Sequence, residues 1–218
     1  MSLPVLIMGP SGSGKTYSLK QFKPEEVGVI SVEKGRLPFR SEIKVIKIPA
    51  AFKDVDDYAT LNRAKYAWLM NAIDKAKCKA IVIDDSQYLM VNELFDRASE
   101  KGYAKFTTMA ANFRNLIHFI NELNQEDKIV YFLHHTETGA DGREKVKTIG
   151  KMLDEKLTVE GCFDIVIFCQ DHKFITQANG ISTAKSPEDM FDLEMPNDLK
   201  LVDTKIREYY GMKGEKNG

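Results

Sequence analysis

A glycine-rich loop near the start of the chain has the residue types and spacing of a phosphate-binding site. It matches the pattern G-x-x-x-x-G-K-[ST] and comprises Gly9, Pro10, Ser11, Gly12, Ser13, Gly14, Lys15 and Thr16, with Tyr17 next to it. The glycines let the backbone close around an anion, with its N–H groups pointing inward at the start of a helix. We expect Lys15 to reach the β- and γ-phosphates of a bound nucleotide and the Thr16 hydroxyl to ligate Mg²⁺.

Two adjacent carboxylates follow the apolar segment at residues 80–83. An acidic residue at the carboxyl end of a buried strand is where phosphate-loop proteins hold magnesium, which predicts Asp84 as a metal ligand. Successive side chains on a strand point in opposite directions, so we expect Asp85 to do something else. It either orients the attacking water or caps the helix that begins near Gln87. The chain has no guanine-reading N-K-x-D motif, which favours ATP.

A third carboxylate, Glu33, ends the apolar segment at residues 27–32. In a doubly wound sheet the carboxyl ends of the strands face the ligand crevice. Glu33 is therefore placed to polarise water against the γ-phosphate, and we prefer it to Asp85 because RecA-like enzymes carry their catalytic glutamate at this position. The alternative is a solvated glutamate in a loop.

Two histidines, His134 and His135, follow the apolar segment at residues 129–133. A polar side chain at the tip of this strand can sense the γ-phosphate and transmit its loss. The alternative is a pair of structural histidines, one buried and one exposed, and alternation alone leaves open which one points inward. Zinc binding is disfavoured because no third ligand lies nearby at a suitable spacing.

Apolar segments alternate with helical patterns along the chain, which predicts an α/β fold: a doubly wound, mostly parallel sheet with helices on both faces. We expect strands at residues 3–8, 27–32, 45–48, 80–83, 129–133, 165–169 and 174–177, and helices at residues 15–22, 58–76, 89–98, 109–123 and 199–210. A polar loop is expected at residues 138–147. We predict one domain over residues 1–211 and a disordered tail at 212–218.

The composition excludes several classes of protein. The 218 residues carry 31 Lys and Arg against 32 Asp and Glu, so no basic field covers the whole protein. A hydrophobic fraction of 43% excludes a disordered chain. Three cysteines without a C-x-x-C pair argue against a disulfide framework. The apolar runs are too short for a bilayer, and a motif at Gly9 leaves no place for a signal peptide, so we expect a cytoplasmic protein without a membrane partner.

Taken together, these motifs resemble the short RecA-core P-loop ATPases of bacteriophages and prophages that are grouped with single-strand annealing recombination proteins. The resemblance rests on the phosphate loop, V-I-D-D-S at Val82, Y-F-L-H-H-T-E at Tyr131, and blocks that start at Thr148, Thr183 and Met195. It implies an ATPase that handles single-stranded DNA, a homo-oligomer, and a possible single-strand binding protein as partner. It also implies that a neighbouring subunit supplies a cation to the site, with Lys185 and Arg207 as candidates.

The loop at residues 138–151 is the candidate contact for single-stranded DNA, because it leaves the strand that ends in the two histidines. Its cations are Arg143, Lys145, Lys147 and Lys151. Each phosphate neutralised on a single strand contributes about 0.7 log units of salt dependence. Base stacking would come from Tyr103 or Phe106. The alternative is a solvated loop.

Two other functions stay open. One is a nucleotide-binding adaptor, such as a helicase loader, that works through protein contacts. The other is a small-molecule phosphotransferase, whose lid would need several arginines. The candidate lid at residues 138–147 contains only Arg143, which disfavours this second function.

Overall fold

Six parallel strands form the centre of the structure, a computed structural model that describes residues 2–52, 55, 57–125, 127–149 and 158–212. These strands are β1 (Leu3–Gly9), β2 (Val27–Ser31), β3 (Val45–Lys47), β4 (Ala80–Asp84), β5 (Ile129–Thr138) and β7 (Ile165–Gln170). Three further strands of the described chain, each of three residues, pair antiparallel with them or with each other: β6 (Glu144–Val146), β8 (Lys173–Ile175) and β9 (Glu194–Pro196).

The strand order brings together the strand ends that carry the predicted site residues. It is β3-β2-β4-β5-β1-β7-β8-β9, with β6 attached to β5. In the parallel register Gly9 pairs with His135, and Ser31 pairs with Asp84. The carboxyl ends of β1, β2, β4 and β5 therefore meet at one edge of the sheet, as a doubly wound fold requires.

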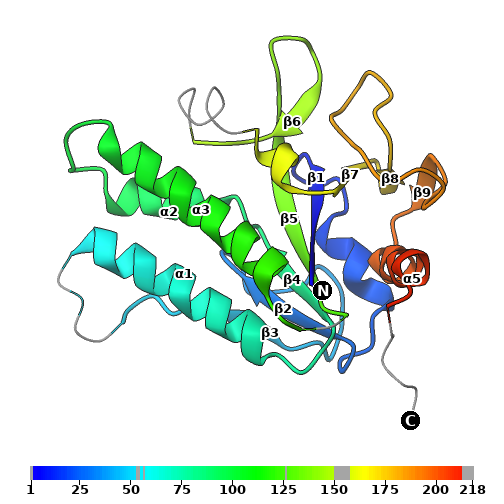
Figure 1. Cartoon of the computed structure of the whole chain (residues 1–218), viewed down its shortest axis with the longest axis horizontal. Helices are drawn as coiled ribbons and strands as arrows, with labels where there is room; N and C mark the ends of the chain where they lie inside the picture. The colour runs from blue at the N-terminus through cyan, green and yellow to red at the C-terminus, as the bar shows by residue number, and fades with distance from the viewer. Residues whose placement is uncertain (1, 53–54, 56, 126, 150–157, 213–218) are drawn as a thin grey trace.

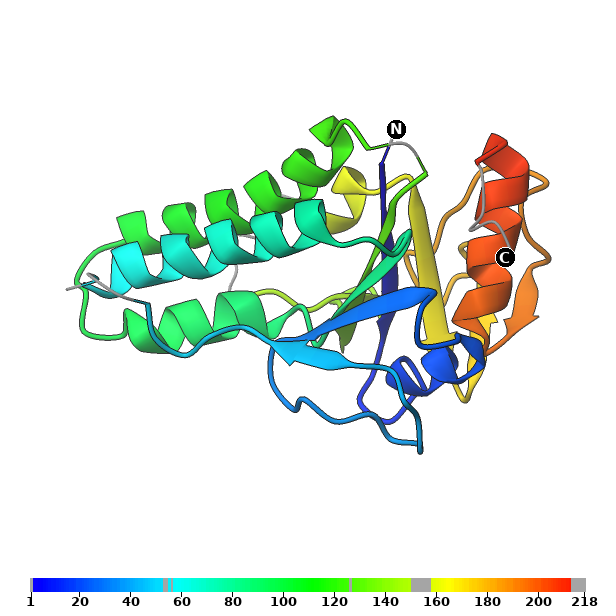
Figure 2. The ribbon, with the colours of Figure 1, turned by 90° about the horizontal axis from the view of Figure 1, so that it is seen from below.

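Helices cover both faces of this sheet (Figures 1 and 2). One face carries α1 (Tyr58–Lys75), α2 (Tyr88–Asp96), α3 (Ala104–Glu122) and the 3₁₀ helix η2 (Val159–Cys162). The other carries the 3₁₀ helix η1 (Thr16–Gln21) and α5 (Leu199–Tyr210). The three helices α1, α2 and α3 lie side by side as a layer, with α5 on the far side of the strands (Figure 2).

Two apolar cores explain why the central strands read as unbroken hydrophobic runs. Side chains alternate across β1: Leu6 and Met8 pack under α1, α2 and α3, whereas Val5 and Ile7 pack toward η1 and α5. Because both faces are covered, every residue of β1 is buried. The predicted α/β architecture is confirmed.

Several local expectations differ from the structure. The helix expected at residues 15–22 is the shorter 3₁₀ helix η1, and α3 begins at Ala104 rather than at 109. The expected loop at 138–147 contains a β-hairpin, because β5 continues to Thr138 and pairs with β6. The expected tail lies outside the described residues except for Met212, whose N–H donates to the carbonyl of Arg207 at 2.8 Å.

Capping residues determine where the helices α1 and α5 begin and where α5 ends. Asp57 accepts from the N–H of Thr60 at the start of α1, and Asp198 accepts from the N–H groups of Lys200 and Leu201 at the start of α5. Gly211 ends α5 with a φ of 62°, a conformation that favours glycine. None of the helices in the described part of the chain is long and apolar enough to cross a membrane.

Candidate nucleotide-binding site

The phosphate loop connects β1 to η1 and has the backbone that only glycines adopt easily. Gly12 and Gly14 have φ values of 80° and 106°. Gly14 is also enclosed: a Cβ built on it would lie 2.7 Å from Nδ1 of His172 and would clash with the amide of Asn197. Asn197 donates to the carbonyl of Gly14 at 3.0 Å. A side chain at Gly14 would therefore distort the loop.

Lys15 is held inside this loop. Its ammonium donates to the carbonyls of Gly9 at 2.7 Å and Pro10 at 2.8 Å, and only 6% of the residue is exposed. Burial lowers the pKa of Lys15 from 10.5 to about 8, and the charges of Asp85 and Asp84 partly oppose that shift. The ammonium is thus desolvated beside the loop N–H groups, where a phosphate would lie.

The residues around Lys15 fit magnesium–ATP. The hydroxyl of Thr16 donates to Oδ1 of Asp84 at 2.9 Å, which joins the two predicted magnesium ligands in one cluster. The hydroxyl of Ser13 is buried and has no partner, so it can bind a phosphate oxygen. Burial and the charge of Asp85 raise the pKa of Asp84, and a divalent cation would relieve both effects.

Asp85 lies in the same cluster as Asp84, which corrects the expectation that they point to opposite sides. β4 ends at Asp84, and Asp85 has a φ of 59°. This left-handed residue turns the chain, so the alternation of a strand no longer applies. The Asp85 carboxylate lies 3.3 Å from Nε2 of His135 and 4.0 Å from the ammonium of Lys34. The bond to His135 and the charge of Lys34 lower the pKa of Asp85 despite its burial.

Glu33 lies beyond β2, two residues from the register pair of Ser31 and Asp84. Its Oε1 accepts from the amide of Asn92 on α2 at 3.0 Å. The side chain lines a cavity between α1 and α2, so in this structure Glu33 faces that cavity, whereas Asp85 lies near Lys15. Sequence reasoning missed Asn92, whose partner depends on how α2 packs.

The two histidines have different surroundings. His134 is fully buried, with Nε2 at 2.9 Å from the carbonyl of Lys147 and Nδ1 at 2.9 Å from the hydroxyl of Ser86. Burial lowers the pKa of His134 to about 4, so the ring is neutral at pH 7. A carbonyl only accepts, so the proton is on Nε2, and Nδ1 accepts from Ser86. His134 points inward, and His135 faces Asp85 at the strand ends.

Comparison with known sequences establishes the family. The model of the AAA_24 family, described as an AAA domain, matches residues 1–192. The chain belongs to the AAA_24 family. With its phosphate loop and strand order, this AAA_24 chain is a P-loop ATPase of the AAA/RecA-like type. A search of curated proteins gave no match.

Two solved structures that match the chain have low sequence identity to it. A KaiC-like protein from the hyperthermophilic archaeon Pyrococcus horikoshii OT3 is 11% identical, with a TM-score of 0.44 over 76% of this chain and 71% of that chain. The P4 protein of bacteriophage phi6, solved in complex with ADP, is 15% identical, with a TM-score of 0.42 over 81% of this chain. The AAA_24 chain spans 55% of that P4 protein.

The two candidate trans cations of the AAA_24 chain lie in different settings. Arg207 is 8% exposed, and its guanidinium donates to both carboxylate oxygens of Asp203 and to the carbonyl of Asp127. Arg207 therefore ties α5 to the segment before β5 and is not available to a neighbouring subunit, which corrects that expectation. Lys185 is half-buried, and its backbone pairs with Val166 of β7. A role in trans for Lys185 stays a prediction.

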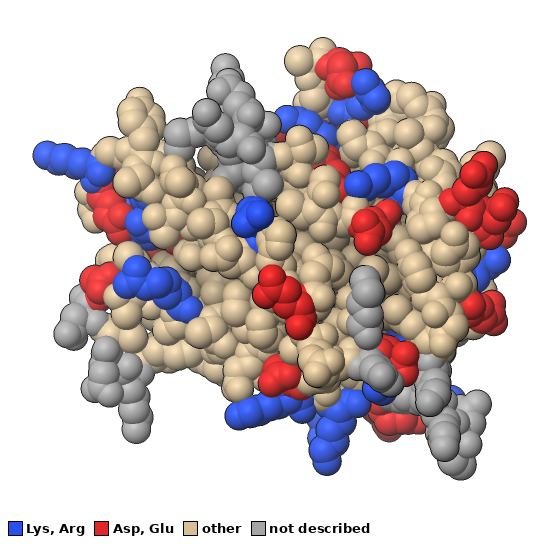
Figure 3. All heavy atoms as spheres, viewed as in Figure 1, with Lys and Arg blue, Asp and Glu red and all other residues tan. Residues whose placement is uncertain are grey.

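The expected DNA loop of the AAA_24 chain is a hairpin whose cations have acidic neighbours. Arg143 lies 2.8 Å from Asp141, and Lys145 lies 3.5 Å from Glu137. Lys147 is exposed, and Lys151 lies outside the described residues. These acidic neighbours make the basic patch weaker than its four cations alone suggest. On the described part of the face in Figure 3, basic and acidic side chains are interspersed.

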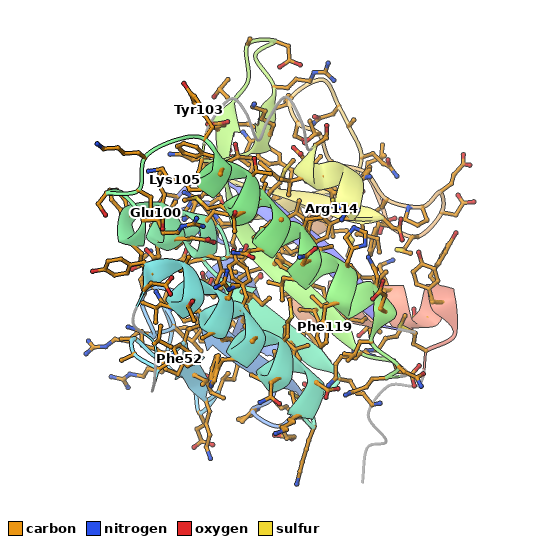
Figure 4. The ribbon with its side chains drawn as sticks, turned by 60° about the vertical axis from the view of Figure 1, so that its left-hand side comes forward. Phe52, Glu100, Tyr103, Lys105, Arg114 and Phe119 are labelled. Carbon is orange, nitrogen blue, oxygen red and sulfur yellow. The ribbon has the colours of Figure 1, made fainter. Side chains whose placement is uncertain are left out.

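The two candidate stacking residues lie around the start of α3. Tyr103 is 79% exposed just before the helix, and Phe106 is half-buried under the ammonium of Lys105. Figure 4 shows Tyr103 and Lys105 at this end of α3, with Phe119 near the other end. Tyr103 is thus accessible to a base, whereas Phe106 already has a cationic neighbour.

Proposed function

We propose that this P-loop ATPase hydrolyses ATP with Mg²⁺ and acts on single-stranded DNA in recombination or annealing, as phage and prophage ATPases of this type do. The observation that carries the DNA part of the proposal is the contact of His134 with Lys147. It connects the turn that follows Asp84 to the β5–β6 hairpin. A change at the nucleotide therefore has a short mechanical route to the candidate DNA contact.

The residues for nucleotide binding are already grouped. The loop N–H groups and Lys15 bind the phosphates, and the Ser13 hydroxyl adds a donor inside the loop. Thr16 and Asp84 would hold a magnesium ion, which would neutralise charge on the phosphate oxygens. Lys15 exchanges the carbonyls of Gly9 and Pro10 for the phosphate when ATP binds.

We propose Glu33 as the group that polarises the attacking water. Asp85 is engaged by His135 and Lys34, and these contacts lower its pKa and make it the weaker base. Glu33, in contrast, accepts from a neutral group, the amide of Asn92. To act on ATP, Glu33 must leave Asn92 and turn toward the Asp84 cluster. Asp85 then orients His135, which faces the site of the γ-phosphate.

Assembly completes the proposed active site. In RecA-type ATPases a neighbour contributes a cation that stabilises the charge of the transition state. With Arg207 fixed inside its own subunit, Lys185 is the remaining candidate among the two. The proposed homo-oligomer acts together with single-stranded DNA, with a single-strand binding protein as a possible partner.

Turnover measurements test this function. We expect hydrolysis of ATP that requires Mg²⁺ and is faster with single-stranded DNA than with duplex DNA. Nucleoside monophosphates should accept no phosphate, because the candidate lid contains only Arg143. Phosphate transfer to a monophosphate would support a phosphotransferase instead, and turnover that ignores single-stranded DNA would remove the DNA part of the proposal.

One observation favours a second function, the nucleotide-binding adaptor. The hairpin cations Arg143 and Lys145 have acidic neighbours, which weakens their attraction for DNA phosphates. An adaptor would bind ATP through the same loop and act through protein contacts. Binding of ATP without turnover, with or without single-stranded DNA, would favour the adaptor.

A further inference from the structure

A cavity separate from the phosphate loop lies between α1, α2 and the carboxyl ends of β2 and β3. Its volume is about 630 Å³, within the usual range of about 300–1,000 Å³ for small-molecule sites. Apolar side chains form part of the wall, among them Val32, Ile48 and Leu89. Polar and charged residues from four elements converge on the rest. The cavity therefore has the mixed character of a binding site.

This cavity is not the place of the nucleotide phosphates. Two strands, β4 and β5, separate β2 from β1, which puts the carboxyl end of β2 about 14 Å from that of β1 at ordinary strand spacing. Lys15, Thr16 and Asp84 are not part of the cavity wall, whereas Glu33 is. A ligand in this cavity would lie beyond Glu33, the proposed catalytic carboxylate, and would not overlap the phosphate loop.

The charged groups that the structure describes in the cavity wall are balanced. They are two carboxylates, Glu33 and Asp96, and two ammonium groups, Lys47 and Lys65. Lys65 pairs with Asp96 at 2.7 Å. Because the charges sum to zero and three of the four have polar partners, the interior disfavours a highly charged ligand such as a triphosphate.

Neutral hydrogen-bonding groups remain for a ligand. Tyr66 lines the cavity and is only 4% exposed, and its hydroxyl is buried without a partner. A buried hydroxyl without a partner destabilises the folded chain, so a ligand acceptor or donor would relieve that cost. The amides of Asn62 and Asn92 also belong to the wall, but they already donate to protein acceptors: Asn62 to the Tyr58 carbonyl and Asp96, and Asn92 to Glu33. The hydroxyl of Tyr66, which can both donate and accept, matches the edge of a flat heterocycle.

The rim supplies an aromatic ring and a cation. Phe95 lines the cavity and is 72% exposed, so its ring is open to a ligand. Lys47 is exposed on the opposite wall, at the end of β3. Aromatic side chains stack on unstacked bases, and a lysine attracts the phosphate next to a base.

We propose that this cavity binds a nucleobase, with Phe95 stacking on its face and Tyr66 on its edge. The base comes either from a free nucleotide or from an unstacked position of a single DNA strand, and both sources present the same ring. The second source rests on the proposed action on single-stranded DNA, whereas the first does not. The site would lie next to Glu33, whose carboxylate accepts a hydrogen bond from Asn92 in the cavity wall.

Fluorescence of 2-aminopurine tests the proposal, because its emission falls when it stacks. The probes are 2-aminopurine riboside 5′-monophosphate and a single-stranded oligothymidine that carries one 2-aminopurine. Magnesium tripolyphosphate, which has no base, is added in excess to fill the phosphate loop. We expect quenching that persists under these conditions. Phe95→Ala should weaken binding about tenfold and Tyr66→Phe about threefold.

Tyr209→Ala is the matched control. Tyr209 is a half-exposed aromatic residue on α5, on the other face of the sheet, and its variant should bind both probes like the original chain. Quenching of the monophosphate would support a free nucleotide as the ligand. Quenching of the oligonucleotide alone would support an unstacked base of single-stranded DNA.

Three results would overturn the proposal: no quenching of either probe, quenching that tripolyphosphate removes, or quenching that both cavity variants leave unchanged. ATP turnover with single-stranded DNA is measured in parallel on the original chain. A lack of stimulation there would count against the proposed function whatever the fluorescence shows. If single-stranded DNA stimulates ATP turnover but both cavity variants quench like the original chain, the nucleobase site is rejected and the proposed function is not.

Discussion

The ring of His134 donates from Nε2 to the backbone carbonyl of Lys147 at 2.9 Å, thirteen residues further along the chain. This bond fastens the segment that leaves β6 to a side chain of the central strand β5. On its other side the same ring accepts from Ser86, which follows the two carboxylates of the nucleotide site. His134 is therefore a positioning residue between the two parts of the proposed mechanism.

The protonation of His134 should destabilise the fold in acid. Its native pKa of about 4 lies below the ordinary 6.5, so between these values the unfolded chain binds a proton that the native chain does not. The free energy of unfolding should therefore fall as the pH drops from about 6.5 to about 4, by about 3 kcal/mol. Urea titrations of the original chain and of His134→Gln measure the difference. An equally steep pH dependence in His134→Gln would contradict this.

Lys15→Ala should abolish binding of magnesium–ATP and leave the fold intact. The glycine backbone keeps the shape of the loop, but the phosphates lose the buried ammonium. Calorimetry with ATP and Mg²⁺, together with circular dichroism, checks both parts. Lys20→Ala is the control, because Lys20 is an exposed lysine on η1 whose side chain contacts Tyr17. Normal turnover in a folded Lys15→Ala chain would rule out this loop as the nucleotide site.

Glu33→Gln should lower ATP turnover by about 10²–10³-fold, as expected on loss of a general base. Affinity for ATP should stay nearly normal, because Glu33 contacts Asn92 and no residue of the phosphate loop. Asp85→Asn should have a smaller effect, since Asp85 orients His135. Steady-state turnover of both variants at saturating ATP decides the assignment, and the opposite ranking would make Asp85 the base.

Removal of three hairpin cations, with Arg143, Lys145 and Lys147 all changed to alanine, should weaken binding of single-stranded DNA and flatten its salt slope. The slope changes by about 0.7 log units for each DNA phosphate that is no longer neutralised. Because acidic neighbours already offset two of these cations, we expect a change equivalent to one or two phosphates rather than three. Basal ATP turnover should survive. Unchanged affinity and slope would remove the hairpin as the DNA site.

Mixing two inactive variants tests whether Lys185 acts between subunits. Neither Lys15→Ala nor Lys185→Ala should turn over ATP alone, but a mixed oligomer contains some sites with an intact phosphate loop and an intact neighbouring cation. We expect partial recovery of turnover at intermediate ratios. Lys105→Ala is the control. The ammonium of this lysine on α3 donates to backbone carbonyls, so the variant should turn over ATP without a second variant in the mixture. No recovery at any ratio would argue against Lys185.

The glycine-rich loop, the position of Asp84 at the end of its strand and the sheet could be predicted from the sequence because each depends on local order. Lys15 and Thr16 belong to one continuous motif, and Asp84 ends an unbroken apolar strand. The turn at Asp85 could not be predicted, because its left-handed backbone does not follow from residue type. Its joint position with Asp84 is known only from the structure.

The partners of two charged side chains, Lys145 and Arg207, were also missed. The pair of Lys145 and Glu137 depends on the register of β5 and β6, which the sequence does not specify for a short hairpin. Arg207 did carry a signal: Asp203 lies four residues before it, at the spacing of a helical ion pair. That spacing predicts an internal partner, and it explains why Arg207 is not available for a neighbour.

The amide of Asn197 that holds the carbonyl of Gly14 spans 183 residues of sequence. During synthesis the phosphate loop therefore emerges long before the residue that clamps it. A ribosome-bound fragment that stops before Asn197 would carry the complete motif without its clamp. Nucleotide affinity should consequently rise late, so that retention on an ATP resin would report completed folding and not merely the presence of the motif.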